Sequence, residues 1–238
     1  IKQAARFARG NFLYWNVGVD GETAQALSTP PPAGRVTIDA DFAPTVALLE
    51  RLRAGEAADV AILTEKGVDD LIAEGRLRPN SRTDVALSFV GVAVKQGAPK
   101  PDISSVDALV KALLGAKSIA YSASASGTYL SGELFPKLGI AEKIKDKSKR
   151  IVSERVGDVV ARGDAEIGFQ QVSELLPIEG IDYVGPLPDG AQKVTVFSAG
   201  IASSARNPEQ ARKLIQFLAA PAVYPAIRKY GLEPAVAK

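Results

Sequence analysis

The sequence predicts an α/β protein with two lobes. Short apolar runs of strand type alternate with amphipathic segments of helical spacing along most of the chain. Two longer β-rich runs, at 85–94 and 194–203, bracket a complete set of such alternating elements. We therefore expect the chain to leave a first lobe (1–84 and 195–238), build a second lobe (85–194) and return, with a ligand cleft between the lobes. The alternative is a single doubly wound domain.

In the first lobe, Gly and Pro residues separate the expected elements. Pro44 precedes an amphipathic helix that Gly55 stops, and Gly75 stops a second helix. The predicted strands are 35–38 and 59–63, and the predicted helices are 45–54 and 68–74. Pro30, Pro31 and Pro32 interrupt the region before them, where the strand 11–17 and the helix 22–27 are expected.

In the second lobe the alternation restarts after a turn-rich segment at 97–101. Ser104 or Ser105 is the expected N-cap of its first helix. The predicted strands are 118–121, 150–153, 166–169 and 182–184, and the predicted helices are 105–114, 128–138, 157–162 and 172–175. Helices at 208–218, with Asn207 as cap, and at 221–230 are expected to return to the first lobe.

The composition narrows the possible functions. The 238 residues carry a formal net charge of +2, with 46% hydrophobic and 24% charged residues, as in an ordinary globular protein. Lys and Arg are interspersed with Asp and Glu, so no nucleic-acid partner is expected, and the basic stretch 143–150 is expected to be a solvated surface. Without cysteine or histidine, the chain has no disulfides and no Ser-His-Asp triad.

The chain contains no methionine, so we expect Ile1 to follow the removal of an N-terminal segment. A secretory signal peptide is one such segment, and a trimmed chain is the alternative. No apolar run reaches the ~20 residues of a membrane-spanning helix. We therefore expect a secreted, periplasmic, monomeric protein.

A serine-rich loop is the most distinctive candidate binding segment. Residues 120–129 read Ala-Tyr-Ser-Ala-Ser-Ala-Ser-Gly-Thr-Tyr and lie between a predicted strand and a predicted helix. Ligands of open α/β sheets bind at the carboxyl ends of strands, where this loop is expected. We therefore expect Ser126, Gly127 and Thr128 to contact a ligand through hydroxyl and backbone N–H groups, the alternative being a helix cap.

Other polar residues stand at the ends of predicted strands or the starts of predicted helices. Each alone is more often a cap or a surface residue, but together they would form a hydrogen-bonding site for a small polar solute. These candidates are Thr45, Thr64, Ser153, Arg155 and Gln171, with Glu154 and Gln170 beside them. The acidic residues Asp20, Asp39, Asp41 and Asp69-Asp70 show no spacing that indicates acid–base catalysis or a metal site, so neither cofactor nor metal is expected.

Several segments resemble the molybdate-type periplasmic solute-binding proteins of ABC transporters, in a branch whose ligands are mostly unassigned. The first is the 53–64 segment, Arg-Ala-Gly-Glu-Ala-Ala-Asp-Val-Ala-Ile-Leu-Thr. Similar segments lie at 97–104, 162–171, 185–188, 211–218 and 230–234, and the resemblance covers about residues 35–236.

The resemblance implies a type II periplasmic-binding-protein fold, with a mixed, mostly parallel sheet flanked by helices in each lobe. In this family Thr45 falls at a ligand-binding serine, Ser126 at a backbone N–H donor, and Ser153 near a second donor. Gln171 replaces a tyrosine of the molybdate binders, and Asp20 would repel an oxyanion in the first ligand loop. An organic acid or another small solute is therefore as well supported as molybdate or tungstate.

We predict from these observations a non-enzymatic binding protein. Its lobes would close on a small-molecule or oxyanion ligand and deliver it to a membrane ABC permease. One alternative is an enzyme on the same scaffold, an isomerase or lyase of small organic acids, which paired acidic groups with perturbed pKa values would favour. A second alternative is the ligand-sensing effector domain of a transcription regulator.

Overall fold

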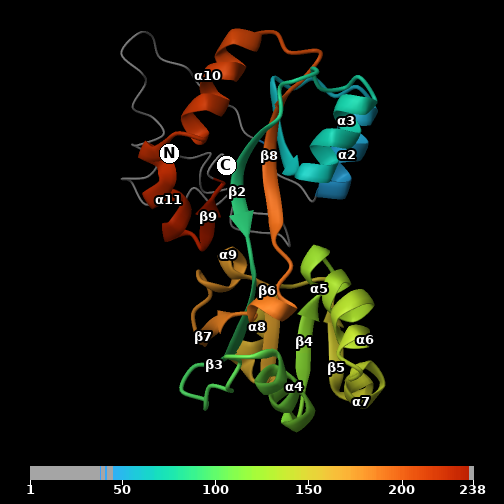
Figure 1. Ribbon diagram of the computed structural model, residues 1–238, viewed down its shortest axis with the longest axis vertical. Helices are drawn as coiled ribbons and strands as arrows, with labels where there is room; N and C mark the ends of the chain where they lie inside the picture. Colours follow the sequence, from blue (N-terminus) through green and yellow to red (C-terminus); the bar gives the residue numbers. More distant parts are fainter. Residues whose placement is uncertain (1–37, 39–40, 42–44, 236–238) are drawn as a thin grey trace. The chain divides into compact units, whose positions relative to one another are not determined.

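The computed structural model describes residues 38, 41 and 45–235 (Figure 1). They form two compact units. Unit 1 contains the described residues up to Ser88 and those from Thr195 onward, and unit 2 is Phe89–Val194. The chain passes between the units at Ser88–Phe89 and at Val194–Thr195. The hinge motion expected of these two connections stays a prediction, and the elements expected before residue 38 lie outside the described residues.

Unit 1 contains a four-stranded sheet with the order β1-β8-β2-β9. Its strands are β1 (Val60–Thr64), β2 (Thr83–Ser88), β8 (Thr195–Ile201) and β9 (Leu232–Pro234). Its helices are α2 (Thr45–Arg53), α3 (Glu65–Ala73), α10 (Pro208–Leu218), η5 (Pro221–Val223) and α11 (Tyr224–Lys229).

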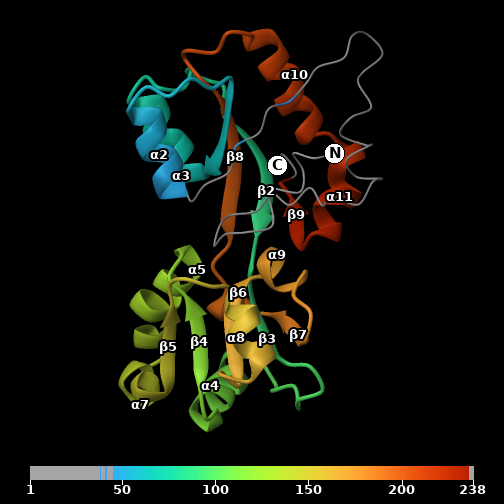
Figure 2. The ribbon, with the colours of Figure 1, turned by 180° about the vertical axis from the view of Figure 1, so that it is seen from behind.

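Alternating side chains of β1 separate the two apolar layers of unit 1. Ala61 and Leu63 pack with α3, whereas Val60 and Ile62 contact the cluster that contains α10. Figure 2 shows α2 and α3 on one side of β8 and α10 on the other. The helices predicted at 45–54 and 208–218 are therefore amphipathic helices that pack on a sheet, as their sequence spacing indicates.

The strand directions in unit 1 differ from the parallel sheet expected for this region. Strand β8 pairs antiparallel with both β1 and β2, and β2 pairs antiparallel with β9. The reason is connectivity, because β8 is the strand on which the chain returns from unit 2 and it inserts between β1 and β2. Strand β9 contains Pro234 and was not expected from the sequence.

Unit 2 contains a five-stranded mixed sheet with the order β5-β4-β6-β3-β7. Its strands are β3 (Val90–Lys95), β4 (Ile119–Ser122), β5 (Ser148–Ile151), β6 (Ile167–Gln171) and β7 (Ile181–Pro186). Its helices and helical turns are α4 (Val106–Gly115), α5 (Ala125–Tyr129), η2 (Leu130–Leu134), α6 (Phe135–Lys137), α7 (Ala141–Ile144), η3 (Lys145–Lys147), α8 (Val156–Arg162), α9 (Val172–Leu175) and η4 (Asp189–Ala191).

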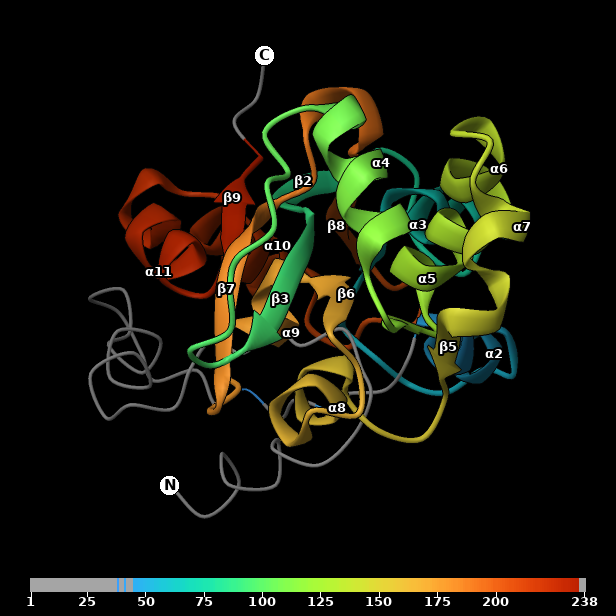
Figure 3. The same cartoon turned by 90° about the horizontal axis from the view of Figure 1, so that it is seen from below.

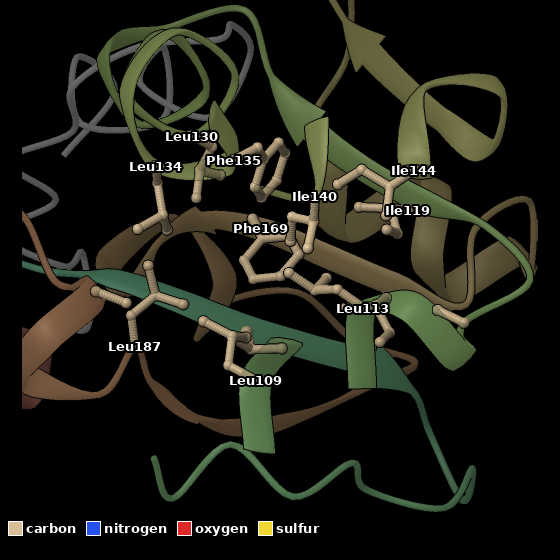
Figure 4. Close-up of a cluster of buried hydrophobic side chains, with 14 of the residues drawn as sticks. Leu109, Leu113, Ile119, Leu130, Leu134, Phe135, Ile140, Ile144, Phe169 and Leu187 are labelled. Carbon is tan, nitrogen blue, oxygen red and sulfur yellow. The ribbon is translucent and has the colours of Figure 1, made fainter. Parts of the chain in front are cut away.

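Helices cover both faces of the unit 2 sheet (Figure 3). On one face, Ile119 of β4 and Phe169 of β6 pack in the main core with Leu109 and Leu113 of α4 (Figure 4). On the other face, Ala120 packs against α8. Strand β4 therefore has no solvent-facing side, and it is held in place where it leads into the serine-rich loop.

The helix expected at 128–138 begins earlier and is not regular. It starts with α5 at Ala125 and passes through the π-helical turn η2 before α6. The backbone N–H of Phe135 donates to the carbonyl of Leu130, five residues back. Pro136 follows directly, and its ring disfavours a regular α-helical turn before it. The irregular turn of this helix therefore lies before the proline.

Candidate functional site

Three parallel strands of unit 2 end at one edge of their sheet. Strand β4 pairs parallel with β5 and with β6, in a register that places Ser122 beside Ile151 and Tyr121 beside Phe169. The segments that follow these strands therefore start side by side, and Figure 1 shows α5 and α9 at this end of unit 2. We call this end the carboxyl edge; it is where α/β sheets bind ligands.

At the carboxyl edge, the serine-rich loop is held by its own hydroxyl groups. The Ser122 hydroxyl donates to Ser124 Oγ over 2.5 Å and accepts from the Ser124 backbone N–H over 2.9 Å. Ser124 Oγ is 3.5 Å from Ser126 Oγ. Ser122 and Ser126 are buried. The loop is thus a preorganised run of hydroxyl groups.

Gly127 fixes how closely α5 approaches the end of β4. A Cβ atom at this position would lie 1.5 Å from the Ser122 carbonyl oxygen. No larger residue fits without moving the loop, so Gly127 is required by packing. The hydroxyl of Ser131 in η2 donates to the Gly127 carbonyl over 2.9 Å.

A buried acid lies in the segment that follows β6. Glu174, in the short helix α9, is 7% exposed, and Gln170 near the end of β6 is 3% exposed. The Gln170 side-chain amide donates from Nε2 to Glu174 Oε2. Its Oε1 accepts from the backbone N–H of Val156 at the start of α8, over 2.9 Å. The Gln170 amide therefore links Glu174 to α8, a neighbouring helix.

Burial raises the pKa of the Glu174 carboxyl from 4.5 to about 7, because desolvation disfavours the carboxylate. The hydrogen bond from Gln170 acts in the opposite direction and limits the rise. Among the described residues, no Lys or Arg forms an ion pair with Glu174. A carboxyl of this kind can both accept and release a proton near neutral pH, as acid–base catalysis requires.

Several predicted ligand contacts also lie at the carboxyl edge. Ser126, Gly127 and Gln171 are buried there, and Gln171 ends β6. Thr128 is exposed on α5, and its backbone N–H donates to the Ser124 carbonyl. Ser153 and Arg155 lie between β5 and α8. Ser153 is exposed, and the Arg155 guanidinium pairs with Asp158 at 2.8 Å.

The two remaining predicted contacts belong to unit 1. Thr45 is the first residue of α2. Thr64 ends β1 and is the N-cap of α3, where its hydroxyl accepts from the backbone N–H of Gly67 over 3.3 Å. The Thr64 hydroxyl thus caps a helix, which was the alternative to ligand binding.

Glu174 is the residue that the sequence analysis missed. It lies in the correctly predicted turn 172–175, but no motif marks it. Its proximity to Gln170, four residues earlier, could have suggested a pair. Its burial, which changes its chemistry, depends on α9 packing against β3, β6 and α8.

The described part of the chain offers no group of three or more acidic side chains placed to hold a metal ion. Asp41, one of the acids weighed for a metal site, pairs with Arg51. Nor does any described helix have both the length and the apolar character needed to cross a membrane.

The fold and the carboxyl edge define an α/β protein of the solute-binding type that also carries a buried carboxyl group with a raised pKa. Residues 23–233 match the model of the bacterial extracellular solute-binding proteins. The chain belongs to this family, which confirms the resemblance found in its motifs. The family description indicates a small-molecule ligand and an extracellular setting.

A relative of this chain changes the functional prediction. The chain is 43% identical to the aconitate isomerase of a Pseudomonas species over 226 residues, 93% of this chain and 86% of the relative. That relative is an enzyme. The prediction of a non-enzymatic transport protein is therefore wrong, and the comparison favours the alternative of an isomerase on the same scaffold. The prediction relied on the missing His and Cys residues and overlooked a buried carboxyl group.

Solved structures confirm the fold class, an α/β periplasmic-binding-protein fold with two sheets flanked by helices. One is described as the substrate-binding domain of a molybdenum ABC transporter from Clostridium difficile. It has a TM-score of 0.72 and 18% identity, with 99% of this chain and 95% of that chain covered. The periplasmic molybdate-binding protein of Azotobacter vinelandii has a TM-score of 0.65 and 20% identity, with 92% of each chain covered.

Proposed function

We propose that this protein is an isomerase that moves a proton within a small unsaturated polycarboxylate, and that aconitate is the first substrate to test. The observation that carries the proposal is Glu174, a carboxyl buried at the carboxyl edge whose pKa is about 7. It occurs in a chain that is 43% identical to an aconitate isomerase. Glu174 is the proposed proton-transfer group.

The chemistry of aconitate suits a single carboxylate base. Its double bond joins two carbons that each carry a carboxylate, and the neighbouring CH2 group carries the third. Removing a proton from this CH2 leaves an electron pair shared over three carbons. Returning the proton to the other terminal carbon moves the double bond and allows cis or trans geometry. The formula is unchanged, and the base is regenerated.

The developing negative charge needs stabilisation by preorganised donors. We propose that Ser126, the backbone of Gly127 and Gln171 bind substrate carboxylates at the carboxyl edge. The buried hydroxyls of the serine-rich loop are of the right chemical type for this role. An isomerase of this kind needs no permease, so an ABC permease is not part of the proposal. Action in the periplasm remains part of it.

The test is to incubate the purified chain separately with cis-aconitate and trans-aconitate and follow both isomers by proton NMR. We expect both reactions to reach the same mixture of isomers. Maleate is the matched control, because it has a double bond between carboxylates but no CH2 group to lose a proton. We expect no conversion of maleate to fumarate. Conversion of maleate, or no conversion of either aconitate isomer, would contradict the proposal.

A further inference from the structure

The Gln170 side chain occupies an unusual position between a backbone donor and a buried acid. Its amide oxygen faces the Val156 N–H, and its amide nitrogen faces Glu174. All three groups belong to unit 2 and lie among residues that are largely inaccessible. Both ends of the amide are therefore engaged.

The backbone fixes which way this amide points. An amide has one accepting end and one donating end, and the two can exchange by a flip of the side chain. The Val156 N–H can only donate, so a flip would place two donors against each other. The Gln170 amide must therefore present its NH2 group to Glu174.

We propose that Gln170 is a positioning residue that keeps Glu174 Oε2 as a hydrogen-bond acceptor, so that the catalytic proton is gained and lost at Oε1. This inference rests on the proposed function, since it assigns the atom through which Glu174 would act. A proton on Oε2 would make that oxygen a weaker acceptor for the Gln170 NH2 group. The protonated acid therefore carries its hydrogen on Oε1, which fixes the direction of proton transfer.

The charged and titratable groups around α9 do not supply another partner for the Glu174 carboxyl. They lie on α8 and at its N-cap, on β3 and on its neighbour β7, whereas β6 carries none. They are Arg155, Asp158, Arg162, Lys95, Asp182 and Tyr183. Arg155 pairs with Asp158, and Arg162 pairs with Glu154 and Asp164. Gln170 pairs with Gly91 near the start of β3, whereas Lys95 is the last residue of that strand. Asp182 accepts from the Gly97 N–H, and Tyr183 lies against Gly91.

The test compares the titration of Glu174 in the wild type and in Gln170→Leu, using carbon-13 NMR of protein labelled at glutamate carboxyl groups. The Glu174 signal is identified by its absence from the spectrum of the Glu174→Gln variant. Loss of the donor should raise the pKa of Glu174 by about one unit, and the acidic limb of the activity profile should move by the same amount. If Gln170→Leu does not fold, Gln170→Met keeps the length of the side chain, removes the donor and adds no charge. It should move the pKa in the same direction.

The matched control is Gln192→Leu. Gln192 also accepts from backbone N–H groups, those of Val90 and Lys193, and donates to the carbonyl oxygens of Val90 and Leu187, but it forms no hydrogen bond with Glu174. Its loss should lower stability and leave the Glu174 titration unchanged. An unmoved Glu174 pKa in a folded Gln170 variant would overturn the positioning role, even if the wild type isomerises aconitate. A shifted pKa without isomerase activity would instead reject only the proposed function.

Discussion

Replacing Glu174 with glutamine should make the protein more stable and inactive. The substitution keeps the shape of the side chain and its acceptor for the Gln170 amide, but it removes the ionisable group. The folded state holds the Glu174 carboxyl with a pKa of about 7, against 4.5 as its ordinary value. The unfolded chain therefore releases this proton more readily than the folded protein does, and ionisation of Glu174 opposes folding.

The sign and the size of the stability change follow from this difference in pKa. The penalty is absent below the unfolded pKa, grows as the pH rises from 4.5 to about 7, and is complete above that range. A shift of this size corresponds to about 3 kcal/mol. The gain in stability of Glu174→Gln should thus be less than about 1 kcal/mol at pH 5 and about 3 kcal/mol at pH 8.

Thermal unfolding at pH 5 and pH 8 measures the effect. At pH 8 the Tm of Glu174→Gln should exceed that of the wild type by roughly 6–12 °C. Isomerase activity should fall by ~100-fold or more, because the proton-transfer group is gone. An equal Tm difference at both pH values would refute the inference that Glu174 is buried with a raised pKa. Full activity in the variant would refute its role in proton transfer.

Three further substitutions test the structural framework. Gly127→Ala should destabilise the protein by about 3 kcal/mol, since the new Cβ would meet the Ser122 carbonyl at 1.5 Å; denaturant unfolding measures this. Ser105→Ala should cost about 1 kcal/mol by removing the N-cap of α4; an unchanged midpoint would show that the cap is dispensable. Lys147→Met should cost about 1 kcal/mol, because this ammonium donates to two carbonyl oxygens at the end of α4. Lys145→Met, at an exposed lysine, is its control and should change stability by less than about 0.5 kcal/mol.

Local signals predicted much of the fold. Helix α4 is bounded by a serine N-cap that makes the expected hydrogen bond, from the Ala108 N–H to Ser105 Oγ over 3.1 Å. Helix α10 begins at Pro208. Such positions are set by interactions within a few residues, which a single sequence displays. The antiparallel β8 and the short β9 depend on pairing between distant segments, which local patterns do not encode.

The candidate site was predictable only in part. The serine-rich loop was found because a strand, small hydroxyl residues and a helix follow one another in the sequence. Glu174 was not found, because an isolated Glu in a helical turn is normally a surface residue. Its chemistry arises when α9 is buried against β3, β6 and α8, a consequence of tertiary packing.

Isomerisation of aconitate in D2O by the wild type and by Glu174→Gln tests the central claim most directly. We predict that the wild type interconverts the isomers and that, at equilibrium, both carry deuterium at the two terminal carbons of the three-carbon unit. Glu174→Gln should remain folded and incorporate almost none over the same time. No isomerisation by the wild type, or equal isomerisation and equal deuterium incorporation by both proteins, would contradict proton transfer through Glu174.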